Sequence, residues 1–222
     1  MKNNRVQVIS DIAEIINSNP GCCFLRKAEL IFESSIENDI DLLLTHDANN
    51  TLWKYLKKLG FKKKIDSKIL NIYLYGAQPH IHYYNKNLDL HFDCVFGLFH
   101  KSVHIISQPG FEITHWIPLD KSIQEDSIKE FSKIKINECE INFLRSEVEL
   151  VHLLAHVILD KKGNTDTYYK ERIPLLLKKS DINKLKNMLN LVFFNFTDYL
   201  IELLEKNKFD LLFQEYIAFG DY

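Results

Sequence analysis

Two short acidic segments, in which charged and apolar residues alternate, constrain the fold of this chain more than any other feature. The first segment is Asp39-Ile40-Asp41-Leu42-Leu43-Leu44, and the second is Leu88-Asp89-Leu90-His91-Phe92-Asp93. In an extended strand, alternate side chains point to the same side, so each segment places its carboxylates on one face and its apolar residues on the other. We therefore expect two strands, each with one acidic face and one buried face.

The carboxylates of the two segments meet at one point if the strands are neighbours in one sheet. Mg²⁺ and Mn²⁺ prefer such oxygen ligands, so Asp39, Asp41 and a third carboxylate predict a divalent metal site. The simpler interpretation of Asp39 and Asp41 is a helix cap or a solvated strand end. We expect Asp89 to be the third ligand, with Asp93 as the rival, because both lie on one face and spacing does not choose between them.

This arrangement is the minimum that metal-assisted phosphoryl or nucleotidyl transfer requires. Asp39 and Asp41 would hold the metal, and Asp89 or Asp93 would complete the site and act as base on an acceptor hydroxyl. His91, between these two, is either a partner that orients a ligand or an exposed strand residue.

The surrounding pattern predicts an α+β fold, with an N-terminal mixed sheet and helices followed by a C-terminal helical bundle. Apolar spacing predicts helices over about 8–17 and 48–59, the latter ended by Gly60, and a short strand at 22–25. Extended segments at about 68–75, 81–84 and 88–96 are typical of a β-meander. Strand signals cease after about Asn142, and we therefore expect an α/β domain over 1–142 and a helical domain over 143–222.

The composition is that of a protein with a sizeable core and without an overall charge that favours nucleic acid. The chain is 46% hydrophobic, so it can bury a sizeable core, and 28 basic against 30 acidic side chains leave a formal charge of −2. That balance gives no global field for nucleic acid, and the basic residues from Lys57 to Lys64 are read as a solvated helix end and loop.

The lack of a recognisable targeting signal and the spacing of the cysteines predict a soluble, cytoplasmic protein. The chain has no apolar run of about 18 residues, the length that a membrane span needs, and its first residues do not resemble a signal peptide. Cys22, Cys23, Cys94 and Cys139 lack the spacing of a zinc site, and we interpret them as reduced core residues.

The order of these motifs resembles the polymerase-β-like nucleotidyltransferase superfamily. More narrowly, the chain is similar to uncharacterised bacterial nucleotidyltransferase-like proteins that are found with surface polysaccharide genes. This similarity is carried by four segments: Phe24-Leu25-Arg26, Asn38-Asp39-Ile40-Asp41-Leu42-Leu43, Leu59-Gly60-Phe61 and Leu88-Asp89-Leu90-His91-Phe92. It covers residues 5–100, and a helical domain often follows this module.

The chain departs from the superfamily in the loop before the acidic strand. Most active members carry a Gly-Gly or Gly-Ser pair there, where backbone amides approach the nucleotide phosphates. This chain has Arg26-Lys27-Ala28 instead, so Arg26 and Lys27 are candidate phosphate contacts, with a solvated loop as the alternative. Tyr169, Lys170 and Arg172 are candidates for a nucleotide pocket in the helical domain, with a solvated helix face as the alternative.

The leading hypothesis is a Mg²⁺-dependent nucleotidyltransferase that uses a nucleoside triphosphate and a small acceptor. The resemblance implies a sugar or polysaccharide precursor as that acceptor. One alternative is an inactive module that keeps the fold and binds a nucleotide or a partner protein. The other is a toxin-type nucleotidyltransferase that modifies tRNA or protein.

Overall fold

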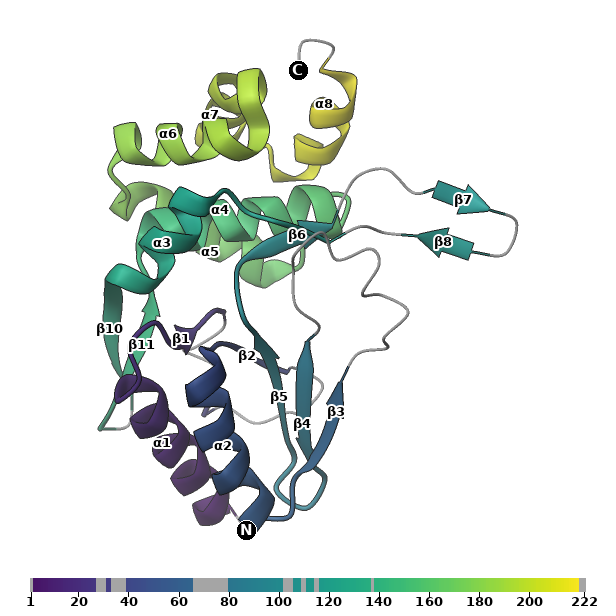
Figure 1. Ribbon diagram of the computed structural model, residues 1–222. Helices are drawn as coiled ribbons and strands as arrows, with labels where there is room; N and C mark the ends of the chain where they lie inside the picture. Colours follow the sequence, from purple (N-terminus) through teal and green to yellow (C-terminus); the bar gives the residue numbers. More distant parts are fainter. Residues whose placement is uncertain are drawn as a thin grey trace. The chain divides into compact units, whose positions relative to one another are not determined.

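The structure of the chain, a computed structural model, describes residues 2–26, 31–32, 39–65, 80–101, 106–108, 111–113, 116–136 and 138–219 (Figure 1). It divides into two compact units: Met1–Leu98 with Ser127–Leu144, and Phe99–Asp126 with Arg145–Tyr222. The mixed sheet and the helical C-terminal region confirm the predicted α+β fold class. Among the described residues, the helices are all too short or too polar to cross a membrane.

The first unit is built on a seven-stranded mixed sheet with the order β10-β11-β1-β2-β5-β4-β3. Pairing is parallel between β2 and β5 and between β1 and β11, and antiparallel elsewhere. The strands are β1 (Cys23–Phe24), β2 (Ile40–Leu43), β3 (Lys62–Ile65), β4 (Ile81–Asn85), β5 (Leu90–Val95), β10 (Phe131–Ile136) and β11 (Cys139–Leu144). Most of each acidic segment therefore lies in one of two adjacent parallel strands, β2 and β5, in the middle of the sheet.

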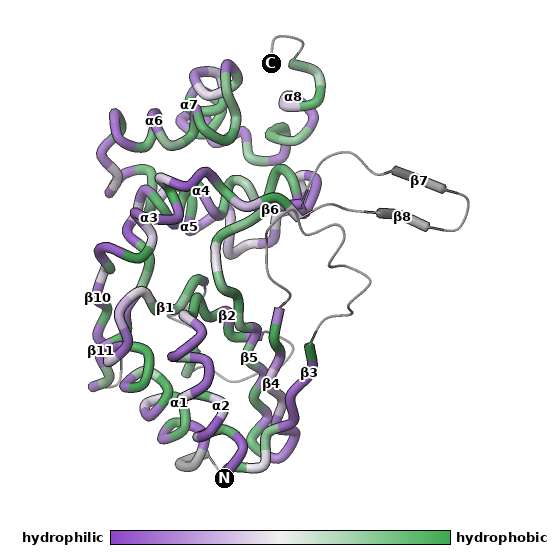
Figure 2. The backbone as a smooth tube through the Cα atoms, in the orientation of Figure 1, coloured by the Kyte–Doolittle hydropathy of each residue, from purple (hydrophilic) through white to green (hydrophobic). Residues whose placement is uncertain are grey.

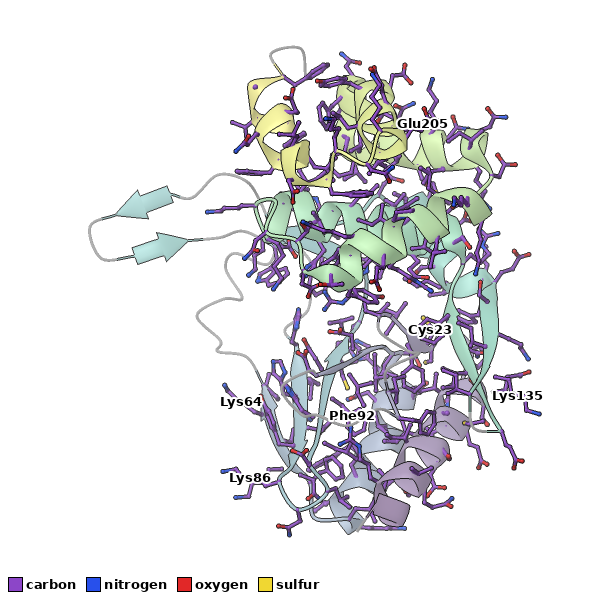
Figure 3. The ribbon with its side chains drawn as sticks, turned by 180° about the vertical axis from the view of Figure 1, so that it is seen from behind. Cys23, Lys64, Lys86, Phe92, Lys135 and Glu205 are labelled. Atoms are coloured by element: carbon purple, nitrogen blue, oxygen red, sulfur yellow. The ribbon has the colours of Figure 1, made fainter. Side chains whose placement is uncertain are left out.

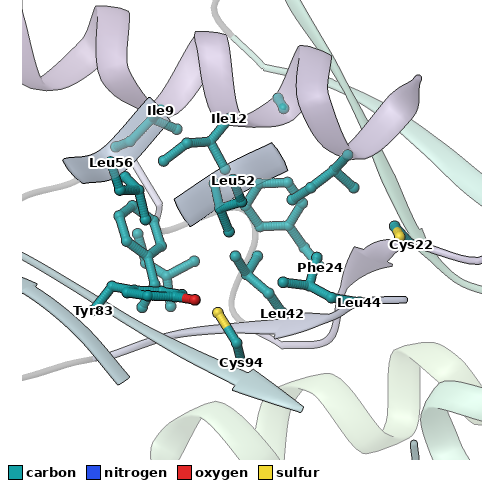
Figure 4. Close-up of a cluster of buried hydrophobic side chains, with 14 of the residues drawn as sticks. Ile9, Ile12, Cys22, Phe24, Leu42, Leu44, Leu52, Leu56, Tyr83 and Cys94 are labelled. Carbon is teal, nitrogen blue, oxygen red and sulfur yellow. The ribbon is translucent and has the colours of Figure 1, made fainter. Parts of the chain in front are cut away.

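Helices α1 (Lys2–Asn17) and α2 (His46–Lys58) pack on the apolar face of this sheet and close the core. Figure 4 shows side chains from both helices directed toward Leu42 and Cys94 of the strands. In Figure 2 the hydropathy along both helices alternates, as expected for helices with one buried face. The apolar residues of the acidic segments are thus committed to the core, which leaves their polar residues on the opposite face.

The ends of α2 follow from local chemistry. The side chain of Thr45 accepts a hydrogen bond from the amide of Ala48 and caps the first turn. At the other end the chain turns at Gly60, which has a φ of 78°, a left-handed conformation that glycine adopts without steric cost. The predicted role of Gly60 after this helix agrees with this geometry.

The meander of the first unit differs from the expected one at its first strand. β4 and β5 lie where the extended segments at 81–84 and 88–96 were predicted, but the described strand that pairs with β4 on its outer side is β3. All four residues of β3 are exposed, which explains why its lysines resembled a solvated loop. The expected strand over 68–75 lies outside the described residues.

The second unit is mainly helical. Its helices are α4 (Ser146–Ala155), which continues into a π-helical turn at His156–Asp160, α5 (Thr167–Lys179), α6 (Ile182–Phe193), α7 (Thr197–Glu205) and α8 (Leu212–Ala218). Helix α3 (Lys121–Lys129) spans the boundary between the two units. Two short antiparallel pairs complete the unit: β6 (Phe99–Lys101) with β9 (Trp116–Pro118), and β7 (Ile106–Gln108) with β8 (Phe111–Ile113).

Candidate functional site

A row of polar residues crosses four neighbouring strands of the first unit. The register pairs Asp41 of β2 with Asp93 of β5. It also pairs Asp93 with His82 of β4, and His82 with Lys64 of β3. Residues paired in this way project from the same face of a sheet. In Figure 3, Phe92 lies in the interior of this unit and Lys64 projects from the edge of the sheet.

Three carboxylates meet on this face. Oxygen atoms of Asp39, Asp41 and Asp93 all lie within 4.8 Å of one another. Asp41 is 6% exposed and Asp93 is 8% exposed, while Asp39, just before β2, is the least buried of the three. Negative charges held this close and this far from water require a positive partner, because like charges in a low-dielectric site repel strongly.

Asp89 is not in this cluster. It lies in the turn between β4 and β5 with a φ of 53°, so the strand begins only at Leu90 and the alternation of its side chains does not extend back to Asp89. Its carboxylate is 61% exposed and lies 3.8 Å from Nη1 of Arg5 in α1. The structure therefore favours the rival, Asp93, over Asp89 as the third carboxylate.

Arg26 supplies the positive partner within the cluster. Its Nε donates to Oδ2 of Asp41 at 2.9 Å, and its Nη2 donates to Oδ1 at 2.7 Å. Burial raises the pKa of Asp41, with smaller contributions from the charges of Asp39 and Asp93, while the Arg26 guanidinium opposes this shift. Arg26 was predicted as a phosphate contact, but in this structure its guanidinium is engaged with a carboxylate.

Histidines surround Asp93 on its other side. Nδ1 of His80 lies 3.0 Å from Oδ1 and 3.1 Å from Oδ2 of Asp93. Burial by itself raises the pKa of Asp93, but the hydrogen bond and charge of His80, with His82 and Arg26, outweigh it and place the pKa below its usual value. Asp93 is therefore a carboxylate held in its ionised form.

His91 lies beside the cluster, on the same strand as Asp93. Its Nε2 is 3.1 Å from Nδ1 of His82, and its ring stacks on Tyr84 with centroids 4.2 Å apart. Burial lowers the pKa of His91, although the carboxylates of Asp39, Asp93 and Asp41 oppose this effect. His91 is half-buried among these contacts, and its supporting role stays a prediction.

Sequence reasoning missed His80 and His82. The signal was present, because His80 and His82 alternate with Ile81 and Tyr83 in the same way as the acidic segments do. Only the antiparallel pairing of β4 with β5 places these imidazoles against Asp93.

The other predicted binding residues lie elsewhere in the chain: one before β2, and three in the second unit. Lys27 lies outside the described residues. In the second unit, Arg172 donates from Nε and Nη2 to the two carboxylate oxygens of buried Glu149, at 2.7 and 2.8 Å. Tyr169 is buried, and Nζ of Lys170 lies 2.8 Å from Oδ1 of Asp210. The contacts of Arg172 and Lys170 and the burial of Tyr169 all lie within the second unit.

The donor set of the carboxylate cluster fits a hard divalent cation. Three carboxylates offer oxygen ligands of the kind that Mg²⁺ and Mn²⁺ take, and Asp41 and Asp93 come from rigid paired strands. The competing feature is Arg26, which already holds both oxygens of Asp41. A separate pocket of about 360 Å³, between α1, α2 and the β4–β5 turn, is lined by none of these carboxylates.

Comparison with known proteins shows the fold. No family model matches the chain, and no curated protein matches its sequence. Among solved structures, the chain is similar to the solution structure of the antibiotic-resistance factor ANT(2'')-Ia, with 13% sequence identity and a TM-score of 0.50. The match covers 94% of this chain and 99% of that chain. At such low identity the likeness concerns the fold alone.

Proposed function

We propose that this chain is a metal-dependent nucleotidyltransferase, which moves a nucleotidyl group from a nucleoside triphosphate to the hydroxyl group of a small acceptor. One observation carries the proposal: Asp39, Asp41 and Asp93 converge on one face of a sheet with the nucleotidyltransferase fold. The same three carboxylates on an unrelated sheet would argue much less, because acidic clusters are common on protein surfaces.

In the proposed reaction, the acceptor oxygen forms a bond to the α-phosphorus of the nucleotide. The bond from that phosphorus to the α,β-bridging oxygen breaks, and pyrophosphate leaves. Asp39 and Asp41 would hold the metal ion, and Asp93 would complete the site and take the proton of the acceptor hydroxyl. When bound, Mg²⁺ or Mn²⁺ orients the phosphates and neutralises the charge that develops on them. His80 keeps the Asp93 carboxylate in position through its contact at 3.0 Å.

Two chemical classes of acceptor are proposed. The sequence resemblance suggests a sugar or polysaccharide precursor, and the similarity to an antibiotic-resistance factor suggests an aminoglycoside as a second class to test. Both classes present hydroxyl groups, so the chemistry required of Asp93 is the same.

A second candidate function is a non-catalytic module that keeps the fold and binds a nucleotide or a partner protein. The bidentate contact between Arg26 and Asp41 favours it, because the guanidinium occupies both oxygens of a carboxylate that the catalytic site needs. In this reading Arg26 takes the place of the metal as the counter-charge.

The test is pyrophosphate release, measured with each common nucleoside triphosphate, Mg²⁺ or Mn²⁺, and a panel of sugar phosphates and aminoglycosides. Asp93→Asn should lower the rate by at least about 100-fold, the usual effect of removing one electrostatic contact to the transition state. Asp89→Asn is the matched control, since it makes the same chemical change at a residue of the β4–β5 turn, and its rate should stay close to that of the unmodified chain.

Two results would overturn the proposal. The first is an equal loss of the rate of pyrophosphate release in Asp93→Asn and Asp89→Asn. The second is an absence of pyrophosphate release with every nucleotide and acceptor, combined with a nucleotide-dependent rise in melting temperature that survives Asp93→Asn. That pattern is the one expected of the binding module.

A further inference from the structure

A second group of potential ligands lies on the same face of the sheet, and it contains nitrogen. His80 precedes β4 and His82 lies within it two residues later, so both imidazoles project from one face. Asp93 is paired directly with His82 across the β4–β5 ladder. One ligand atom from each of His80, His82 and Asp93 lies within 4.8 Å of the other two.

The separations within this group match those of a metal centre. Around a tetrahedral zinc ion with bonds of about 2.0–2.1 Å, neighbouring ligand atoms lie about 3.3 Å apart. In this structure Oδ1 of Asp93 lies 3.0 Å from Nδ1 of His80 and 3.7 Å from Nδ1 of His82. These two separations lie within about 0.4 Å of the tetrahedral value, and the ligand atoms of His80 and His82 lie within 4.8 Å of each other.

The nitrogen ligands of this group favour a different kind of metal ion from the one that the three carboxylates favour. Imidazole nitrogen suits zinc, iron, cobalt, nickel and copper, whereas magnesium and calcium take oxygen ligands almost alone. Nε2 of His91 lies 3.1 Å from Nδ1 of His82, so a further imidazole nitrogen borders the group. The group thus combines two imidazoles and one carboxylate, with a third imidazole in contact with His82.

We propose that His80, His82 and Asp93 bind a divalent transition metal ion, for which Zn²⁺ and Co²⁺ are the probes. Three protein ligands leave at least one coordination position for water or a bound molecule. Asp93 belongs both to this group and to the carboxylate cluster. The proposal rests on the ligand geometry and does not depend on the proposed transfer reaction.

The competing explanation is a set of ordinary hydrogen bonds. In that case His80 donates a hydrogen bond to Asp93, and His82 and His91 share a second hydrogen bond. The group of His80, His82 and Asp93 then holds no metal. The two explanations differ in what happens when Co²⁺ is added, because a cobalt ion with imidazole ligands in a four- or five-coordinate site absorbs visible light much more strongly than the hydrated ion.

The experiment titrates the full chain, first stripped of metal with a chelator, with Co²⁺ in the visible range, and measures bound Zn²⁺ by equilibrium dialysis. We expect one tightly bound ion per chain with a strong visible spectrum. His80→Asn and His82→Asn should each weaken binding by more than about 10-fold, the lower end of the loss seen when a metal site loses even an outer partner. If one of these two variants fails to fold, the other still provides the test.

The controls separate this group from its surroundings. His46→Asn replaces an exposed histidine of α2 that stacks on Phe96, and it should bind Co²⁺ like the unmodified chain. Asp39→Asn removes a ligand of the carboxylate cluster only, and it should keep the Co²⁺ spectrum. The proposal is overturned if Co²⁺ shows only the spectrum of the hydrated ion, if His46→Asn weakens binding as much as His82→Asn, or if Asp39→Asn abolishes the spectrum.

Discussion

The ion pair between Arg26 and Asp41 leads to a prediction about stability and metal binding together. The side chains of Arg26 and Asp41 are 17% and 8% exposed, and two hydrogen bonds join them. Removal of one partner from a buried pair costs about 3–5 kcal/mol, because the remaining charge is left buried without a counter-charge. Since Arg26 retains some exposure, we expect Arg26→Met to lower the free energy of unfolding of the first unit by about 3 kcal/mol.

Magnesium should recover much of this loss. A ligand present at about 100 times its dissociation constant stabilises the folded state by about 2.7 kcal/mol. In the unmodified chain a metal ion competes with the Arg26 guanidinium for the oxygens of Asp41, whereas in Arg26→Met it does not. We therefore expect Mg²⁺ to stabilise Arg26→Met more than the unmodified chain, and to bring the two within about 1 kcal/mol of each other.

The assay is urea denaturation followed by tryptophan fluorescence, with and without Mg²⁺. The chain has two tryptophans, of which Trp53 lies in the first unit and Trp116 in the second. Trp53 stacks on Tyr83 with ring centroids 5.2 Å apart, so its emission reports unfolding of the first unit. The variants of Arg26 and Asp41 are therefore made in a Trp116→Phe background.

The matched control is the double variant Arg26→Met/Asp41→Leu. It replaces both partners with apolar side chains, a change that is often close to neutral for stability, and it should lose the response to Mg²⁺. The reasoning is refuted if Arg26→Met costs less than about 1 kcal/mol, well below the range for a buried pair. It is also refuted if Mg²⁺ stabilises Arg26→Met, the unmodified chain and the double variant equally.

Two further predictions concern buried polar groups. The hydroxyl of Tyr83 donates to the side-chain oxygen of Asn49 at 2.8 Å, so Tyr83→Phe should cost about 1–3 kcal/mol, measured by urea denaturation at neutral pH. Burial raises the pKa of Tyr83, and the stability that its neutral form contributes is complete below about pH 10 and lost as the pH rises toward the folded-state pKa. The difference from Tyr83→Phe should therefore shrink above pH 10, and a constant difference would contradict this. In the second unit, Arg172→Met removes the ion-pair partner of the buried Glu149 and should cost about 3–5 kcal/mol, measured by Trp116 fluorescence in a Trp53→Phe background, whereas Arg172→Met/Glu149→Leu should recover most of that loss.

The alternation of Asp39 and Asp41 with apolar residues was sufficient to predict strand β2 and its polar face. The prediction succeeded because side-chain direction in a strand depends only on position along the chain, and the apolar residues bury one face. The same reasoning placed β5 correctly but extended it two residues too far, to include Leu88 and Asp89. The left-handed turn at Asp89 could not be read from the pattern, because the pattern continues unchanged across the turn.

The exposed strand β3 shows a different limit. No alternation of apolar residues marks Lys62, Lys63 and Lys64. Their pairing with β4 depends on backbone hydrogen bonds, which almost any residue can form. Edge strands rich in lysine are common because charge discourages further pairing. Local sequence therefore indicated solvent exposure correctly and gave no sign of the strand.

By itself, the sequence determined that this chain is an α+β protein with carboxylates on one side of a central strand, because alternation and apolar periodicity are local properties of the chain. Only the tertiary structure decided that Asp93 joins Asp39 and Asp41, that Arg26 neutralises Asp41, and that His80 and His82 border the same site. Those choices depend on which strands pair and in which register, and a shift of one residue would turn each of these side chains to the other face. The packing of α1 and α2 on the apolar face determines which face is left polar.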